Sequence, residues 1–150
     1  MYAYAREDLD RWERELGREL TNGMFGENLT TSGVDVTGLL IGERLTVGED
    51  GLVLEVTSPR TPCQTFVQWL GIRGWMKTFT AAGVPGAYFR VIHPGTIRGG
   101  DRIDVLSQPD HNVTVGTVFT ALMGDSDLLP TLAVADALPE KIKALVAKRT

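Results

Sequence analysis

The sequence predicts a mainly β domain, built as a barrel with peripheral helices and a helical C-terminal tail. Two observations predict this fold. Between residues 23 and 107 the chain is a series of short apolar runs separated by glycine and proline, which is typical of strands and turns. Helical spacing of apolar residues is confined to a few segments outside these runs. A chain of 150 residues fits one core, so we expect a single compact domain without an internal linker.

The chain is expected to begin with a strand and a helix. Tyrosines alternate with small or apolar residues over residues 1–4, which predicts the end of a strand. An amphipathic helix is predicted over residues 6–16, with Gly17 as its end. Its apolar stripe consists of Leu9, Trp12 and Leu16.

A hairpin and further strands are predicted in the middle of the chain. Residues 45–47 and 52–56 flank a Gly-Glu-Asp-Gly turn, which is a strong hairpin signal. The other predicted strands are residues 87–92, 103–106 and 113–115.

Two further helical segments are expected. One contains Trp75 and Phe79 and ends at Gly83. The other begins at Pro139, since proline is favoured in the first turn of a helix. We therefore divide the chain into a barrel domain over residues 1–110 and a last strand with a helical tail over residues 111–150.

The composition argues against several classes of partner. A net charge of -4 gives no basic field for nucleic acid or for an anionic membrane surface. No apolar run approaches the ~18–20 residues that cross a bilayer. Acidic residues stand near the N-terminus where a signal peptide would be hydrophobic, so we do not expect secretion. A single cysteine cannot form an internal disulfide, which suits a reducing compartment. We expect a cytoplasmic protein that binds neither nucleic acid nor membrane.

Local motifs for metals, nucleotides or hydrolysis are missing from the sequence. There is no glycine-rich phosphate loop, no Cys-x-x-Cys and no His-x-x-x-His. The two histidines, His93 and His111, lie far apart in turn-like contexts. A zinc site and a Ser-His-Asp triad remain open, but nothing local supports either of them.

The segment from Thr57 to Cys63 carries the chemistry that the sequence does indicate. Two prolines should make it leave the sheet after Val56 as a rigid loop, with the only cysteine just beyond it. Arg60 lies three residues before Cys63, and a nearby guanidinium favours the thiolate, which is the nucleophile and the metal ligand. The alternative is a buried structural cysteine.

Two other stretches stand out. Gly26 allows a tight turn, while Glu27 and Asn28 place a carboxylate and an amide where a strand should begin. Either they belong to a site or they only form a turn. Residues 95–101 are rich in glycine but precede no helix, so we interpret them as a hairpin between strands instead of a nucleotide loop.

Several short motifs, taken in order, resemble the molybdenum-cofactor-sulfurase C-terminal (MOSC) family, and most closely its stand-alone YiiM-like branch. Each motif is weak alone, but the order and spacing hold over about residues 1–107. The matching segments are Trp12–Gly17, Phe25–Thr30, Ile41–Arg44, Glu55–Cys63, Gly86–Val91 and Gly95–Asp101.

The resemblance implies a β-barrel that binds the molybdenum cofactor. In such proteins the cysteine matching Cys63 ligates molybdenum or carries sulfur, so the resemblance makes Cys63 the catalytic residue and the metal ligand. Cofactor contacts are expected from Arg60, Asn28, Thr57 and Glu27. The YiiM-like branch is associated with the reduction of N-hydroxylated bases and related compounds. A separate reductase must then donate the electrons, because the sequence has no flavin, haem or iron–sulfur motif.

The chain departs from the family pattern at its N-terminus. Family members carry a longer N-terminal segment with the first barrel strands and a His-Gly-Gly stretch, so we interpret the chain as an isolated piece, a sequence with a misassigned start, or a shortened member. A shortened member should have an open strand edge that permits a homodimer. The alternatives to the reductase are a carrier module that holds a persulfide on Cys63, and an inactive binding domain.

Overall fold

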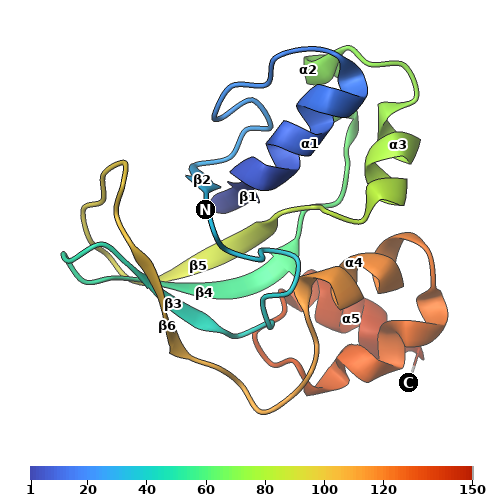
Figure 1. Cartoon of the computed structure of the whole chain (residues 1–150). Coiled ribbons are helices and arrows are strands. Elements are labelled where there is room, and N and C mark those ends of the chain that lie inside the picture. Colours follow the sequence, from blue (N-terminus) through green and yellow to red (C-terminus); the bar gives the residue numbers. More distant parts are fainter. Residues whose placement is uncertain (150) are drawn as a thin grey trace.

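The computed structural model describes residues 1–149, and its framework is one mixed sheet flanked by two groups of helices (Figure 1). The strand order is β2-β1-β5-β4-β3-β6. The strands are β1 (Tyr2–Ala5), β2 (Leu29–Thr31), β3 (Arg44–Val47), β4 (Leu52–Pro59), β5 (Ala87–His93) and β6 (Ile103–Ser107). The helices are α1 (Arg6–Leu16), α2 (Gln64–Leu70), α3 (Trp75–Ala82), α4 (Val115–Met123), the 3-10 helix η1 (Ser126–Val134) and α5 (Glu140–Arg149).

Four of the strands form a Greek key. β3, β4 and β5 are consecutive antiparallel neighbours, and β6 returns to pair with β3. Residues 95–101 are therefore a crossover loop, and our prediction of a hairpin there is wrong. The physical reason is that both sides of β5 are already paired, one with β1 and the other with β4. The strand after this loop must pair at the far edge.

The prediction of a mainly β fold is only partly correct, because more residues lie in helices than in strands. The sheet is a half-barrel with helices packed around it. The predicted strand at 113–115 is one source of the difference. Thr114 makes a single bridge to Leu40, and its Oγ1 then accepts a hydrogen bond from the Thr117 N–H at 3.0 Å. This cap starts α4, so a β-branched run that resembles a strand enters a helix instead.

Other predicted elements are confirmed. α1 spans the predicted residues 6–16, and Gly17 ends it with a left-handed φ of 67°, which glycine adopts without strain. The β3–β4 hairpin has the expected turn, and the predicted helical segment before Gly83 consists of α2 and α3. No helix within residues 1–149 has both the length and the apolar character to span a membrane.

The interior divides into two clusters. The first, called here the aliphatic core, lies on the inner face of the half-barrel and includes Leu45, Leu54, Val56, Val118 and Leu132. The second, called the aromatic core, lies among β1, α1, α2 and α3, the upper group in Figure 1. Its members are Tyr2, Tyr4, Leu9, Trp12, Leu20, Phe25, Phe66, Leu70, Trp75, Phe79 and Phe119.

Candidate functional site

The loop that carries the cysteine is shorter than the sequence suggests. β4 continues past Val56 to Pro59, because a bulge between Val56 and Ser58 lets Ser58 and Pro59 still pair with β5. Thr57 lies within this bulge, and its hydroxyl donates a hydrogen bond to the Tyr88 carbonyl at 3.2 Å. Only residues 60–63 then form the loop between β4 and α2.

Cys63 lies at the end of this loop, immediately before α2. Its backbone is extended (φ -131°, ψ 168°), and its carbonyl accepts a hydrogen bond from the Val67 N–H at 3.1 Å. The thiol does not cap the helix, and the side chain is exposed. The alternative of a buried structural cysteine is therefore wrong, and the thiol is open to metal or sulfur chemistry.

Arg60 is half-buried and holds the loop against the aromatic core. Its guanidinium carbon lies 3.7 Å from the centre of the Phe66 ring and 5.0 Å from the centre of the Tyr2 ring. One guanidinium N–H group donates to the Phe25 carbonyl. Among residues 1–149 no hydrogen bond joins Arg60 to Cys63, so support of a thiolate by Arg60 stays a prediction. The contacts of Arg60 with Phe66, Tyr2 and Phe25 hold the loop of residues 60–63 in position.

Most polar groups of the turn before β2 form hydrogen bonds to other groups of the protein. Glu27 is 7% exposed, and its two carboxylate oxygens accept from the Phe25 N–H at 3.0 Å and the Thr30 hydroxyl at 2.9 Å. Asn28 is exposed, and its Oδ1 accepts from the Tyr2 N–H at 2.8 Å. The backbone N–H of Asn28 donates to the Tyr2 carbonyl at 2.8 Å, whereas the side-chain amide N–H groups have no partner among the described residues and can meet a ligand.

Sequence reasoning did not single out Tyr2, yet this residue links the predicted site residues. It contacts Arg60 through its ring and Asn28 through its backbone, and its hydroxyl donates to the Pro85 carbonyl at 2.6 Å. Burial raises the pKa of the Tyr2 phenol above its usual value, while the positive charge of Arg60 acts in the opposite direction. The structure thus gathers Glu27, Asn28 and Arg60 around β1, and Thr57 joins them through Tyr88, whose ring lies 5.0 Å from that of Tyr2.

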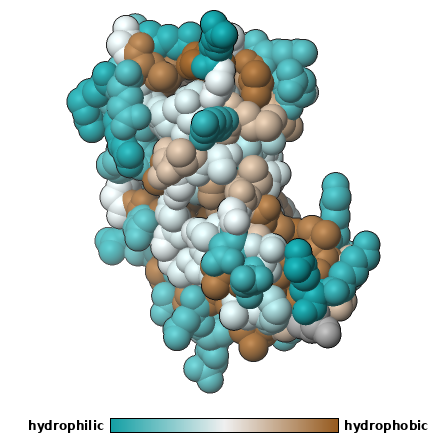
Figure 2. All heavy atoms as spheres, turned by 90° about the vertical axis from the view of Figure 1, so that its right-hand side faces the viewer, coloured by the Kyte–Doolittle hydropathy of each residue, from teal (hydrophilic) through white to brown (hydrophobic). Residues whose placement is uncertain are grey.

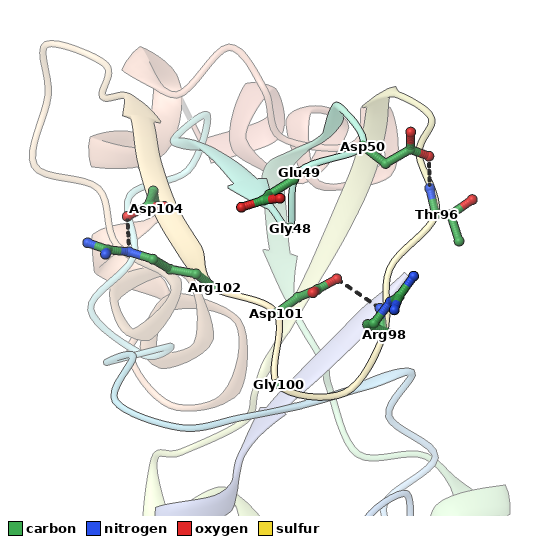
Figure 3. Close-up of a pocket in the computed structure, with 9 residues that line it drawn as sticks. All are labelled: Gly48, Glu49, Asp50, Thr96, Arg98, Gly100, Asp101, Arg102 and Asp104. Atoms are coloured by element: carbon green, nitrogen blue, oxygen red, sulfur yellow. Dashed lines mark hydrogen bonds and ion pairs between the residues drawn. The ribbon is translucent and has the colours of Figure 1, made fainter.

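A separate polar cavity of about 710 Å³ lies at the other end of β4 (Figure 3). It is lined by the β3–β4 turn and by the crossover loop, and none of the predicted site residues lines it. Its carboxylates stabilise these loops: Asp50 accepts from the Thr96 N–H and Asp101 from the Arg98 N–H, both at 2.8 Å. The cavity is therefore explained by loop structure.

The histidines offer no alternative centre. Nδ1 of His93 shares a hydrogen bond with the Gly51 carbonyl at 2.9 Å, and Nδ1 of His111 accepts from the Val113 N–H at 3.0 Å. Within residues 1–149 no three His, Cys, Asp or Glu side chains gather as a group that could hold a metal ion. Neither the zinc site nor the triad left open by the sequence gains support from the described residues.

A comparison with protein families identifies a MOSC domain over residues 1–104. Among curated proteins the chain is 32% identical over 112 residues to the uncharacterized protein YflK of Bacillus subtilis, covering 75% of this chain and 50% of YflK. It is 31% identical over 117 residues to a protein named "Reductase" from Gibberella moniliformis, covering 78% of this chain and 21% of that protein. A third relative is YiiM of Escherichia coli, with 27% identity over 70% of this chain and 47% of YiiM. The chain thus spans about half or less of the length of these relatives.

Solved structures show the same fold. The crystal structure of YiiM from Geobacillus stearothermophilus superimposes with a TM-score of 0.90 at 24% identity, covering 99% of this chain and 77% of that one. The crystal structure of Escherichia coli YiiM gives a TM-score of 0.86 at 25% identity, covering 99% and 76%. The half-barrel and its helices are therefore an arrangement that these crystal structures also have.

Proposed function

The chain belongs to the MOSC domain family, and from that premise we propose that it binds the molybdenum cofactor and reduces N-hydroxylated compounds. The observation that carries the proposal is the place of Cys63: the only thiol is exposed on a loop that a strand, a stacked arginine and the aromatic core hold in position. The name "Reductase" of the Gibberella moniliformis relative supports the reaction class.

The residues present fit such a cofactor in part. Cys63 offers a soft sulfur ligand, which suits molybdenum, and its exposure leaves room for the metal. Asn28 offers free amide N–H groups, and Arg60 retains N–H groups beyond the one that binds Phe25. Glu27 and Thr57 are both 7% exposed and already hydrogen-bonded inside the protein, so we assign them the support of the turn and the bulge.

The proposed reaction divides the chemistry between the cofactor and the chain. When bound, the cofactor would supply a metal centre that takes oxygen from an N–OH group. Conversion of N–OH to N–H consumes two electrons and two protons and releases water, so a separate reductase must donate the electrons. The chain itself binds the metal through Cys63, while Arg60 fixes the loop and Asn28 orients the bound group.

The test is elemental analysis for molybdenum in protein purified from a host that makes the cofactor. We expect near-stoichiometric molybdenum in the wild type and a loss of most of it in Cys63→Ser. A matched control is Arg102→Gln at the other end of the sheet, where the side chain is 85% exposed, and it should keep the metal. Absence of molybdenum from both wild type and control would overturn the proposal.

The exposed thiol also favours a second candidate, a sulfur carrier that holds a persulfide on Cys63. Intact mass spectrometry distinguishes the two functions. A carrier should show a mass increment of one sulfur on Cys63 that a mild reductant removes, with no molybdenum present. A chain with neither metal nor persulfide would be the inactive binding domain.

A further inference from the structure

An exposed surface with unpaired positive charge lies on α2 and α3, the two helices that follow the cysteine loop. Its exposed side chains are Trp69, Arg73, Met76 and Lys77, and we call it the α2–α3 surface. The turn at residues 71–74 joins the end of α2 to the start of α3, so these side chains belong to one end of the helix pair. Figure 2 shows the side of the molecule that bears α3, with hydrophobic atoms among hydrophilic ones in its upper part.

The α2–α3 surface is positive in a protein whose net charge is -4. Between Glu55 and Asp101 the sequence contains no acidic residue, so nothing on these two helices offsets the charge. Arg73 and Lys77 form no ion pair among residues 1–149. Unpaired cations on an exposed surface attract an acidic partner.

The neighbouring helix α1 does not cancel this charge, because acidic residues in its middle pair with arginines of the same helix. These ion pairs join Arg6 to Asp10 and Glu13, and Arg11 to Glu15, at 2.8, 3.2 and 3.0 Å. After α1, Arg18 reaches the end of α2, where its guanidinium donates to the Leu70 carbonyl at 2.9 Å. Glu19 follows Arg18, so this short stretch is neutral and leaves the α2–α3 surface positive.

Trp69 is held in one orientation although it is 68% exposed. Its indole N–H donates to the Met24 carbonyl at 2.8 Å. An exposed tryptophan that is already oriented loses little freedom when a partner covers it. Tryptophan, methionine and arginine are also the residues that protein interfaces favour. The composition of the α2–α3 surface is therefore that of a protein contact.

The α2–α3 surface is tied to the cysteine loop by a shared anchor. Trp69 binds the carbonyl of Met24, and Arg60 of the loop binds the next carbonyl, that of Phe25. α2 begins directly after Cys63, and at 1.5 Å per residue Trp69 lies about 9 Å further along the helix. A protein that covers Trp69 therefore approaches the exposed thiol.

We propose that the α2–α3 surface is the docking site of the separate electron-donating protein, and that this donor presents an acidic face. The inference rests on the proposed function, since it names the partner of the Cys63 centre. Trp69 and Met76 supply apolar contact, while Arg73 and Lys77 attract carboxylates of the donor. The reduced donor is oxidised by the two electrons that the N–OH group takes up, and water supplies the two protons.

The size and charge of the surface favour a transient donor over a second copy of the chain. A two-fold contact would place the cations of one copy against those of the other, and like charges oppose such a contact. Electron-transfer encounters commonly bury less than about 1,200 Å² in total, so a few side chains on one end of a helix pair are sufficient.

Calorimetric titration with flavodoxin, an acidic flavoprotein that donates electrons, tests the proposal. Metal-free wild type should bind it at low ionic strength. The double substitution Arg73→Glu with Lys77→Glu should weaken binding about tenfold or more. The matched control is Arg98→Glu with Arg102→Glu, which changes the net charge equally at exposed arginines at the other end of the sheet, and it should bind like wild type.

Two further measurements separate docking from a structural effect. Trp69→Ala should weaken binding of flavodoxin, whereas Val134→Ala, at a residue of η1 that is 61% exposed, should not. In molybdenum-loaded protein, reduced methyl viologen is a small donor that needs no docking surface. The ratio of the flavodoxin-driven rate to the viologen-driven rate should fall about tenfold in Trp69→Ala and stay constant in Val134→Ala.

The outcomes separate this proposal from the proposed function. If metal-free wild type fails to bind flavodoxin, or if the control pair weakens binding as much as the substitutions at Arg73 and Lys77, the docking proposal is overturned even when molybdenum is present. If only the variants of the α2–α3 surface weaken binding but no form of the protein contains molybdenum, the surface is supported as a docking site and the reductase proposal fails.

Discussion

The aliphatic core and the aromatic core stabilise the molecule in different ways. The aliphatic core covers the inner face of the half-barrel mainly with aliphatic side chains, whose packing depends on shape and volume. In the aromatic core the Phe66 ring meets Phe25, Trp75 and Phe79 edge to face at 5.2, 5.6 and 5.1 Å. Such contacts fix orientation as well as distance.

The candidate site rests on the second of these cores. The guanidinium of Arg60 stacks on Phe66, and the carbonyl that it binds belongs to Phe25. Phe66 and Phe25 are both members of the aromatic core. The comparison teaches that the half-barrel provides the frame, while the aromatic core positions the cysteine loop.

The largest effect is expected from Trp75→Ala, which empties the middle of the aromatic core. Trp75 is fully buried and its indole N–H has no partner within residues 1–149, so the loss is one of packing. We expect the free energy of unfolding to fall by about 3–5 kcal/mol. Urea denaturation followed by circular dichroism measures it. Trp69→Ala, at a side chain that is 68% exposed, is the control and should cost about 1 kcal/mol.

A second variant sharpens the comparison between the two cores. Leu54→Ala in the aliphatic core should lower the free energy of unfolding by about 2–4 kcal/mol, yet leave the rate at which Cys63 reacts with a disulfide reagent unchanged. Phe66→Leu keeps the core filled but removes the ring beneath Arg60, so it should change that rate. Equal thiol reactivity in both variants would show that the aromatic core does not position the loop.

High pH should destabilise the protein through two tyrosines of the aromatic core. Burial raises the pKa of the Tyr2 and Tyr4 phenols above the usual value near 10. Above about pH 10 the unfolded chain therefore releases protons that the folded chain keeps, and stability falls by about 1.4 kcal/mol per pH unit for each tyrosine. Tyr4→Phe should make this decline shallower in urea titrations between pH 9 and 11, after allowance for its lower stability at neutral pH. An identical slope in both proteins would contradict the assignment.

The smallest effect is expected from Arg60→Lys. A lysine keeps the charge but not the planar group that stacks on Phe66 while binding the Phe25 carbonyl. Stability should fall by about 1 kcal/mol. The rate at which the Cys63 thiol reacts with a disulfide reagent should change by a larger factor than the loss of stability alone would produce. Arg90→Lys is a suitable control, because Arg90 pairs with Glu55 on the sheet and not with the aromatic core.

The elements predicted correctly are those that local chemistry determines. Spacing of apolar residues and a terminal Gly17 are sufficient for α1, and a four-residue turn is sufficient for the β3–β4 hairpin. The failures have non-local causes. Thr114 begins a helix because its hydroxyl finds a backbone N–H, and β6 joins β3 because the flanks of β5 are taken.

The same limit applies to the candidate site. The loop with Cys63 was accessible to sequence reasoning because two prolines, an arginine and a lone cysteine lie within a few residues. The role of Tyr2 was not, because its alternation with small residues predicts a strand and says nothing about which side chains its ring will meet.

The position of β1 between β2 and β5 has a consequence for how the chain can fold during synthesis. β1 leaves the ribosome well before its antiparallel partner β5, which lies more than 80 residues further along the chain. Until then Tyr2 and Tyr4 lack the Pro85 and Val84 carbonyls that accept their hydroxyl protons. The aromatic core therefore closes late, through contacts of long sequence separation, and such contacts slow folding. β1 can therefore pair with β2 early, but its other edge stays open until β5 has been made.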